Sequence, residues 1–139
     1  MQIGAGHDFS VGVHVNERGE DTYVYGGLAG GASNCQGIGL FVDNDGADTY
    51  EISSTYSTGL GNHSGECDSF PRTAAPSIGI FLDSGGDEDS YSWPEGDHPT
   101  PDNDSSFGYS QTGSGTEHGG AVDGDDETGV HAAGELPGG

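Results

Sequence analysis

The chain has 139 residues, enough for one domain of ordinary size, and it carries 24 acidic residues against two arginines and no lysine. The formal net charge of −22 excludes nucleic acid as a partner, because counterion-release binding needs clustered cations, and it disfavours anionic lipid for the same reason. No apolar run reaches membrane-spanning length and the first residues lack the regions of a signal peptide, so we expect no membrane insertion. Both a halophile cytoplasm and a cell-surface or extracellular location are compatible with this.

Large apolar side chains are sparse and lie mostly in the first two thirds of the chain. Leu, Ile, Val and Phe account for 22 residues, and 18 of these precede Trp93. After that point proline, glycine and acidic residues dominate, a composition that does not fold alone. We therefore predict a β-repeat domain over residues 1–93 and a loose acidic tail over residues 94–139.

Three segments of the chain repeat one pattern. Each has an apolar-Gly-apolar-x-apolar run, then Asp or Asn, a Gly-containing acidic turn and an Asp-Thr/Ser-Tyr ending, over residues 11–23, 38–50 and 78–91. A Gly-x-Gly or Gly-Gly step precedes each copy. A degenerate fourth copy falls at residues 111–128, inside the predicted tail. Each copy predicts a strand, a tight turn and a second strand.

The repeats predict an all-β fold. The alternation in Val11, Val13 and Val15 indicates a strand with one face buried. One copy cannot bury that face alone, whereas stacked copies can, which predicts a short β-solenoid of about three strand-turn-strand coils. The alternative is a small antiparallel β-sheet or sandwich built from the same hairpins. The exposed ends of a solenoid would favour self-association.

The repeat resembles that of a known family. The runs Gly37-Ile-Gly-Leu-Phe-Val-Asp43 and Gly46-Ala-Asp-Thr-Tyr50 are similar to the Gly-x-Gly-x-Leu-x-Asp-x-Gly-Gly-Asp-Asp-x-Tyr arrays of an uncharacterised prokaryotic repeat family. The resemblance covers about residues 2–93, and the first copy departs from it with Asn16 in place of Asp. It implies an architecture and no reaction. A weaker local similarity is to the repeats-in-toxin calcium-binding turns, although their tandem nonapeptide period is absent here.

Clustered carboxylates on two turns are the candidate metal ligands. Carboxylates held so close repel one another unless a cation or protons intervene. Calcium takes six to eight oxygen ligands from carboxylates and turn carbonyls, whereas magnesium demands tighter octahedral geometry. The alternative is that the carboxylates only cap turns and stay hydrated. The predicted calcium ligands are Asp43, Asp45 and Asp48 on one turn and Asp83, Asp87 and Asp89 on the other.

The acidity has a second interpretation. Many acidic residues, no lysine and few large apolar side chains are typical of proteins adapted to molar salt. There the Debye length falls to about 3 Å, so net charge no longer opposes the compact state. This interpretation predicts a halophilic protein and names no partner.

The aromatic residues divide into two sets. Tyr23, Tyr50 and Tyr91 occupy one repeat position and predict a ladder of stacked rings in the core. Four others fall outside that register and would suit a carbohydrate-binding surface: Tyr25, Tyr56, Trp93 and Tyr109.

We expect a non-enzymatic acidic β-repeat protein of structural or binding type, calcium-binding and adapted to high salt. One alternative is a β-helix-type enzyme acting on polysaccharide through paired carboxylates, Asp43 and Asp83, one coil apart. Another is a disordered acidic chain that folds on a partner. Cys35 and Cys67 either form one disulfide or are free thiols.

Overall fold

The computed structural model describes residues 3–54, 56–62, 75–86 and 88–94 and the strands at 106–112 and 116–124. This part of the chain consists of strands, turns and bends, and it contains no helix that could cross a membrane. The predicted all-β class is confirmed.

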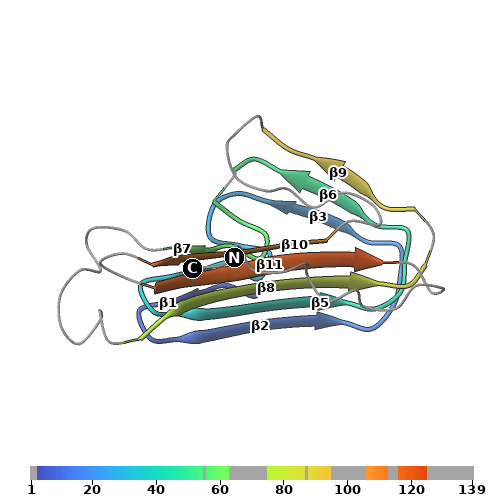
Figure 1. Cartoon of the computed structure of the whole chain (residues 1–139). Coiled ribbons are helices and arrows are strands. Elements are labelled where there is room, and N and C mark those ends of the chain that lie inside the picture. The colour runs from blue at the N-terminus through green and yellow to red at the C-terminus, as the bar shows by residue number, and fades with distance from the viewer. Residues whose placement is uncertain are drawn as a thin grey trace.

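The strands form three small sheets in which most neighbours run parallel (Figure 1). The first sheet pairs β1 (Gly6–His7), β4 (Ser33–Asn34) and β7 (Gly61–Asn62). The second has the order β10-β11-β8-β5-β2, and its members are β2 (Val11–Asn16), β5 (Ile38–Asp43), β8 (Ser77–Ser84), β10 (Ser106–Thr112) and β11 (Thr116–Gly124). The third pairs β3 (Thr22–Tyr25), β6 (Thr49–Ile52) and β9 (Ser90–Ser92).

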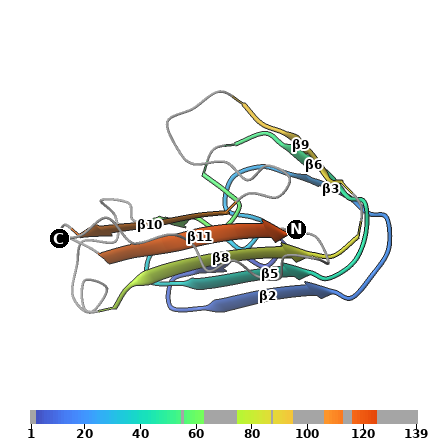
Figure 2. The same ribbon diagram turned by 45° about the vertical axis from the view of Figure 1, so that its right-hand side comes forward.

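The chain visits the three sheets in the same order three times, as β1-β2-β3, β4-β5-β6 and β7-β8-β9, and we call each visit a pass. Figure 2 shows the connections between the second and third sheets lying side by side. Equivalent repeat positions are in register, so Gly12 pairs with Gly39 and Gly39 with Gly79. The antiparallel alternative is wrong for the repeats, because the two strands of each copy lie in different sheets and equivalent strands pair in parallel.

Glycine allows the first two sheets to touch. A Cβ on Gly39 would lie 2.1 Å from the carbonyl oxygen of Ala32, just before β4, and one on Gly12 would lie 1.9 Å from that of Ala5. Gly31, in the step before β4, has φ +75 and its carbonyl accepts a hydrogen bond from Ile80 N of the next pass. The glycine pattern therefore reflects backbone packed on backbone, both within and between passes.

Aromatic rings fill the space between the second and third sheets. The ring of Tyr50 stacks on those of Tyr23 and Tyr91, with 5.2 Å and 4.7 Å between the ring centroids, which confirms the predicted tyrosine ladder. Phe41 stacks on Phe81 at 4.9 Å and meets the tyrosines edge to face. These two aromatic ladders form the centre of the buried core.

The buried face of the second sheet is not its aliphatic face. The alternation is present, but Val11, Val13 and Val15 point outward and are each more than half exposed. In β5 the buried positions are Gly39, Phe41 and Asp43. The inside of the fold has room only for glycine near the first sheet and for flat stacked rings near the third, so the branched side chains lie outside.

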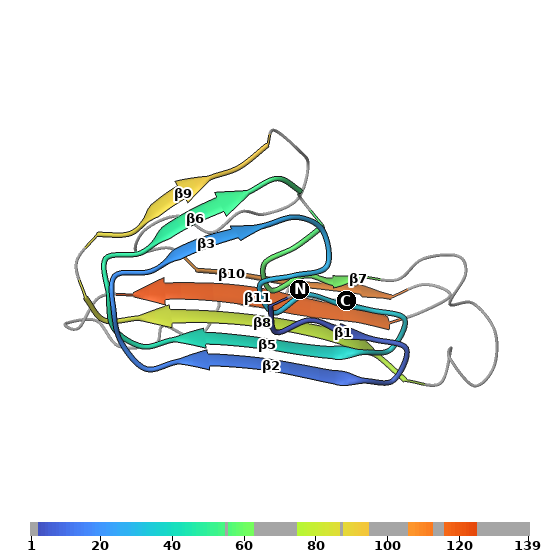
Figure 3. The same cartoon turned by 180° about the vertical axis from the view of Figure 1, so that it is seen from behind.

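The segment predicted as a loose tail contributes two strands to the second sheet. Strand β11 runs parallel to β8, with Gly119 opposite Gly79 and Asp123 opposite Asp83, and β10 closes the edge as its antiparallel neighbour. Figure 3 shows β11 alongside β8 from behind. The division of the chain at residue 93 and the degenerate fourth copy stay predictions.

Candidate cation site between the repeats

Two rows of polar side chains meet where the second sheet turns into the third. The first row is at the ends of β2, β5 and β8, where the register aligns Asn16, Asp43 and Asp83. The second row is Asp21, Asp48 and Asp89, each of which immediately precedes a strand of the third sheet. Parallel in-register strands lie about 4.8 Å apart, so each row places carboxylates from successive passes close together.

The second row ties each pass to the next through the main chain. Asp21 N donates to Asp48 Oδ1 at 2.7 Å, and Asp48 N donates to Asp89 Oδ1 at 2.6 Å. One oxygen of Asp48 and of Asp89 is thereby engaged with the backbone of the preceding pass. These bonds hold the carboxylates of Asp48 and Asp89 against the main chain that enters the third sheet in the preceding pass.

The first row is bound by the tyrosine ladder. Tyr23 Oη donates to Asp43 Oδ2 at 2.5 Å, and Tyr50 Oη donates to Asp83 Oδ2. In the first pass Asn16 replaces aspartate, and its Nδ2 donates to Asp21 Oδ2 at 2.6 Å. The amide thus supplies a donor at the end of the row, where the other passes present a carboxylate.

The two rows combine into two triads of carboxylates. In each triad the candidate ligand oxygens all lie within 4.8 Å of one another. Asp43 and Asp48 are only 0% and 1% exposed, and Asp83 is also buried. The first triad is Asp21, Asp43 and Asp48, and the second is Asp48, Asp83 and Asp89, so that Asp48 is shared.

Two oxygens in this cluster are buried without a hydrogen-bond partner: Asp43 Oδ1 and Asp48 Oδ2. In both residues the other oxygen is engaged, by Tyr23 and by Asp21 N respectively. An ionised oxygen buried without a donor is costly, so this position calls for a cation or a proton.

The electrostatics of the cluster agree with that requirement. Burial, and then the charges of Asp43, Asp89 and Asp21, raise the pKa of Asp48 to about 7, although the hydrogen bond from Asp21 N acts in the opposite direction. Burial together with the neighbouring carboxylate also raises the pKa of Tyr23 and of Tyr50 well above the usual range. Both phenols therefore stay protonated and act as donors.

The triads fit calcium by their chemistry and spacing. Calcium binds carboxylate oxygens at about 2.3–2.6 Å, so oxygens on opposite sides of one ion lie about 5 Å apart at most. The 4.8 Å limit on the separations within each triad meets that condition. All the ligand atoms are oxygen, which suits a hard cation.

The predicted ligands are distributed differently in the structure. Asp43 and Asp48 share a triad, but Asp45, from the same turn, is exposed and lies in neither, and its carbonyl accepts a hydrogen bond from Gly19 N at 2.8 Å. Asp83 and Asp89 share the other triad, and Asp87 lies outside the described residues. The triads form across passes and not within one turn.

Sequence reasoning missed Asp21. It is not among the predicted ligands, and in the first copy Arg18 stands among the acidic residues, where a guanidinium can replace a metal ion. Asp21 occupies the same repeat position as Asp48 and Asp89, directly before Thr/Ser-Tyr, and that position was the signal that could have found it.

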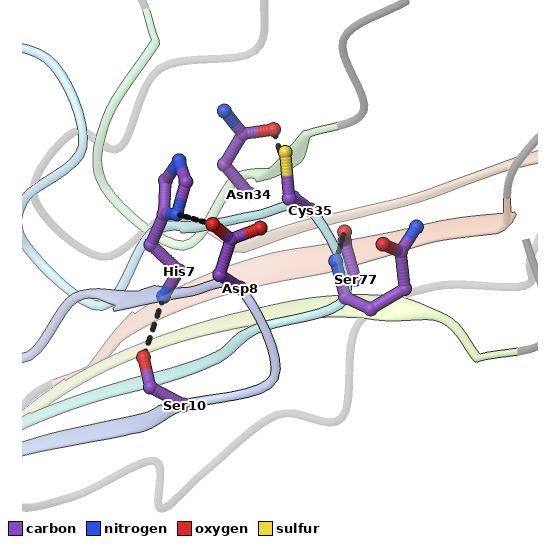
Figure 4. Close-up of polar contacts among 7 residues, drawn as sticks. His7, Asp8, Ser10, Asn34, Cys35 and Ser77 are labelled. Atoms are coloured by element: carbon purple, nitrogen blue, oxygen red, sulfur yellow. Dashed lines mark hydrogen bonds and ion pairs between the residues drawn. The ribbon is translucent and has the colours of Figure 1, made fainter. Parts of the chain in front are cut away.

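A second polar cluster lies at the turns before β2 and β5 (Figure 4). His7 Nδ1 is 3.4 Å from Asp8 Oδ2, but the hydroxyl of Ser10 accepts from His7 N and so closes a turn. This is not the arrangement of a base and a nucleophile. At the equivalent turn Cys35 is buried and disulfide-bonded, and the chain's other cysteine, Cys67, lies outside the described residues.

No protein-family model, no curated protein and no solved structure matches this chain. Function is therefore proposed from its own geometry.

Proposed function

We propose that the chain is a non-enzymatic β-repeat protein of structural or binding type, a short β-solenoid whose coils are joined by calcium. Three observations support the solenoid: the parallel pairing of equivalent strands, the repeated order in which the passes visit the sheets, and the aromatic ladders along the stack. Each pass would then be one coil.

The observation that carries the calcium proposal is the pair of buried, unpartnered oxygens on Asp43 and Asp48. They belong to different repeat positions and converge with Asp21 of the preceding pass. A divalent cation would satisfy both oxygens and offset the repulsion among three carboxylates. In water-exposed turns the same carboxylates would need no ion.

In this proposal calcium is structural. A bound ion would link two coils, and because Asp48 belongs to both triads, the two sites would be coupled through one side chain. In the first coil Asn16 takes the place of the aspartate, and its amide donates where the other coils need a cation. We propose high-salt adaptation as a separate property of the remaining acidic surface, since the charge of −22 includes many residues outside the triads.

The two alternative functions, a polysaccharide-acting enzyme and a carbohydrate-binding surface, have less support. Asp43 and Asp83 are buried and bound to tyrosine hydroxyls, so as a pair they do not face a polysaccharide. Of the aromatic residues considered for carbohydrate binding, Tyr25 is buried in the core, Trp93 packs against it and Tyr56 is exposed, so these three do not gather. The side chain of Tyr109 lies outside the described part of the structure.

Calcium binding by the purified protein tests the proposal, with equilibrium dialysis giving the stoichiometry. We expect one or two ions per wild-type chain and a loss of at least about tenfold in affinity for Asp48→Asn, which removes a ligand of both triads. Asp45→Asn is the matched control, because it makes the same charge change on the same turn at an exposed position. Equal weakening by both variants would show that calcium responds only to net charge, and the site would be rejected.

A further inference from the structure

The outer face of the second sheet is a regular array of aliphatic side chains. Strands β2, β5 and β8 each present three of them in register, and they make up nine of the chain's 17 valine, isoleucine and leucine residues. None of the nine belongs to the buried core. The array, which we call the aliphatic face, consists of Val11, Val13, Val15, Ile38, Leu40, Val42, Ile78, Ile80 and Leu82.

The other two sheets lie on the opposite side of this layer. Inward-pointing Gly39 meets the backbone at Ala32 beside the first sheet, and inward-pointing Phe41 meets Tyr50 of the third. The side views likewise show β3, β6 and β9 on one side of the layer that contains β2, β5 and β8 (Figures 2 and 3). Val13 is 57% exposed and Ile80, on an interior strand, is 37% exposed.

We propose that the aliphatic face is the contact surface between two copies of this chain, which pack sheet on sheet about a twofold axis. The face has no charged or hydrogen-bonding side chain with which to select a polar partner, whereas an identical face is complementary to it by symmetry. Two sheets with apolar faces pack about 10 Å apart and interdigitate their side chains. A basic or lipid partner would need polar contacts that this array does not offer.

The size of the face is compatible with a weak dimer. Its exposed apolar area is on the order of 400 Å², which matches the largest patches on monomers, and these are often functional. Two such faces would bury about 800 Å² in total, below the roughly 1,200 Å² at which stable interfaces begin and within the range of weak, transient contacts. Each copy carries a charge of −22, so repulsion opposes the dimer at low salt and is screened at high salt.

Sedimentation velocity tests the proposal on the whole chain with calcium held constant. At about 0.02 mM protein, where a dimer with a micromolar dissociation constant is mostly formed, we expect a dimer in about 2 M KCl and mostly monomer in about 0.05 M KCl. Ile80→Lys places a charge within the aliphatic face, at the middle position of β8, and we expect at least a hundredfold weaker dimerisation. Val24→Lys is the control, because Val24 is 65% exposed but lies on β3 in the third sheet.

The outcomes distinguish a dimer through the aliphatic face from end-to-end stacking and from contacts through other surfaces. A dimer retained in Val24→Lys and lost in Ile80→Lys, with both variants giving the wild-type far-UV spectrum, supports the proposal. A wild-type monomer in 2 M KCl overturns it, as does a dimer that Ile80→Lys leaves intact. Growth beyond the dimer with rising concentration also overturns it, because end-to-end stacking through edge strands is open-ended, whereas a twofold contact closes.

Discussion

Replacing Asp48 with asparagine is expected to stabilise the protein without calcium and to remove most of the stabilisation that calcium gives. The asparagine Oδ1 can still accept the hydrogen bond from Asp21 N, so the turn is preserved. Without calcium the variant removes a buried charge that faces the carboxylates of Asp43 and Asp89. With calcium it removes a ligand shared by both triads.

The magnitude follows from the pKa of Asp48, which rises from 3.8 unfolded to about 7 folded. A raised carboxyl pKa means that the folded state holds the proton more tightly, so this contribution to stability is complete below about pH 4 and is lost as pH rises through 7. The difference corresponds to at most about 4 kcal/mol. In EDTA at pH 8 we therefore expect Asp48→Asn to be about 2–4 kcal/mol more stable than the wild type, and at pH 4 nearly equal to it.

Urea unfolding of both proteins measures this difference by linear extrapolation. Calcium at a hundred times its dissociation constant should add about 2.7 kcal/mol per occupied site to the wild type and far less to the variant. A less stable Asp48→Asn in EDTA at pH 8 would contradict the unfavourable buried charge, and equal stabilisation of the two proteins by calcium would contradict the role of Asp48 in both triads.

Three further outcomes are expected. Gly39→Ala should lower the free energy of unfolding by at least about 2–3 kcal/mol, because the new Cβ would lie 2.1 Å from a carbonyl oxygen. Gly27→Ala is the control, since its nearest neighbour would be 3.3 Å away, and its stability should lie within about 1 kcal/mol of wild type. Equal melting temperatures for the two variants would contradict this packing. Tyr50→Phe removes the phenol donor to Asp83 and should cost about 1–3 kcal/mol in urea unfolding at pH 7, and an unchanged midpoint would argue against that bond. Calcium binding at pH 6.5 should release protons, because Asp48 has a pKa of about 7; calorimetric heats that are independent of the buffer's ionisation enthalpy would contradict this.

The features that sequence predicted best are those set by the repeat itself. The glycine, aspartate and tyrosine positions recur in each copy, and parallel in-register pairing converts recurrence into contact. The tyrosine ladder follows directly from that. Which face of each strand is buried could not be predicted from the repeat, because hydrophobicity favours the burial of a valine such as Val13 and not of a glycine such as Gly39. Steric room decided the question instead, since backbone packs on backbone at Gly39.

The candidate site was half predictable for the same reason. Proximity in sequence predicts that the aspartates of one turn bind the same ion, but the turn exposes Asp45 and buries Asp48. Contacts between passes depend on how strands of different copies are aligned. Thr22, for example, pairs with Thr49, which lies 27 residues further along the chain in the next copy. The pattern of a single copy does not contain this information. Alignment of the copies by repeat position would have identified Asp21 as well.

The most direct test of calcium as the link between coils is a set of circular dichroism melts in EDTA, in millimolar calcium, and in about 2 M KCl with EDTA, where surface charge is screened. The account predicts a cooperative, strand-rich transition that calcium shifts upward by about 10 °C or more, a shift that KCl alone does not reproduce. An equal shift in KCl with EDTA, or no response to calcium, would contradict it and leave the acidic residues as an adaptation to salt.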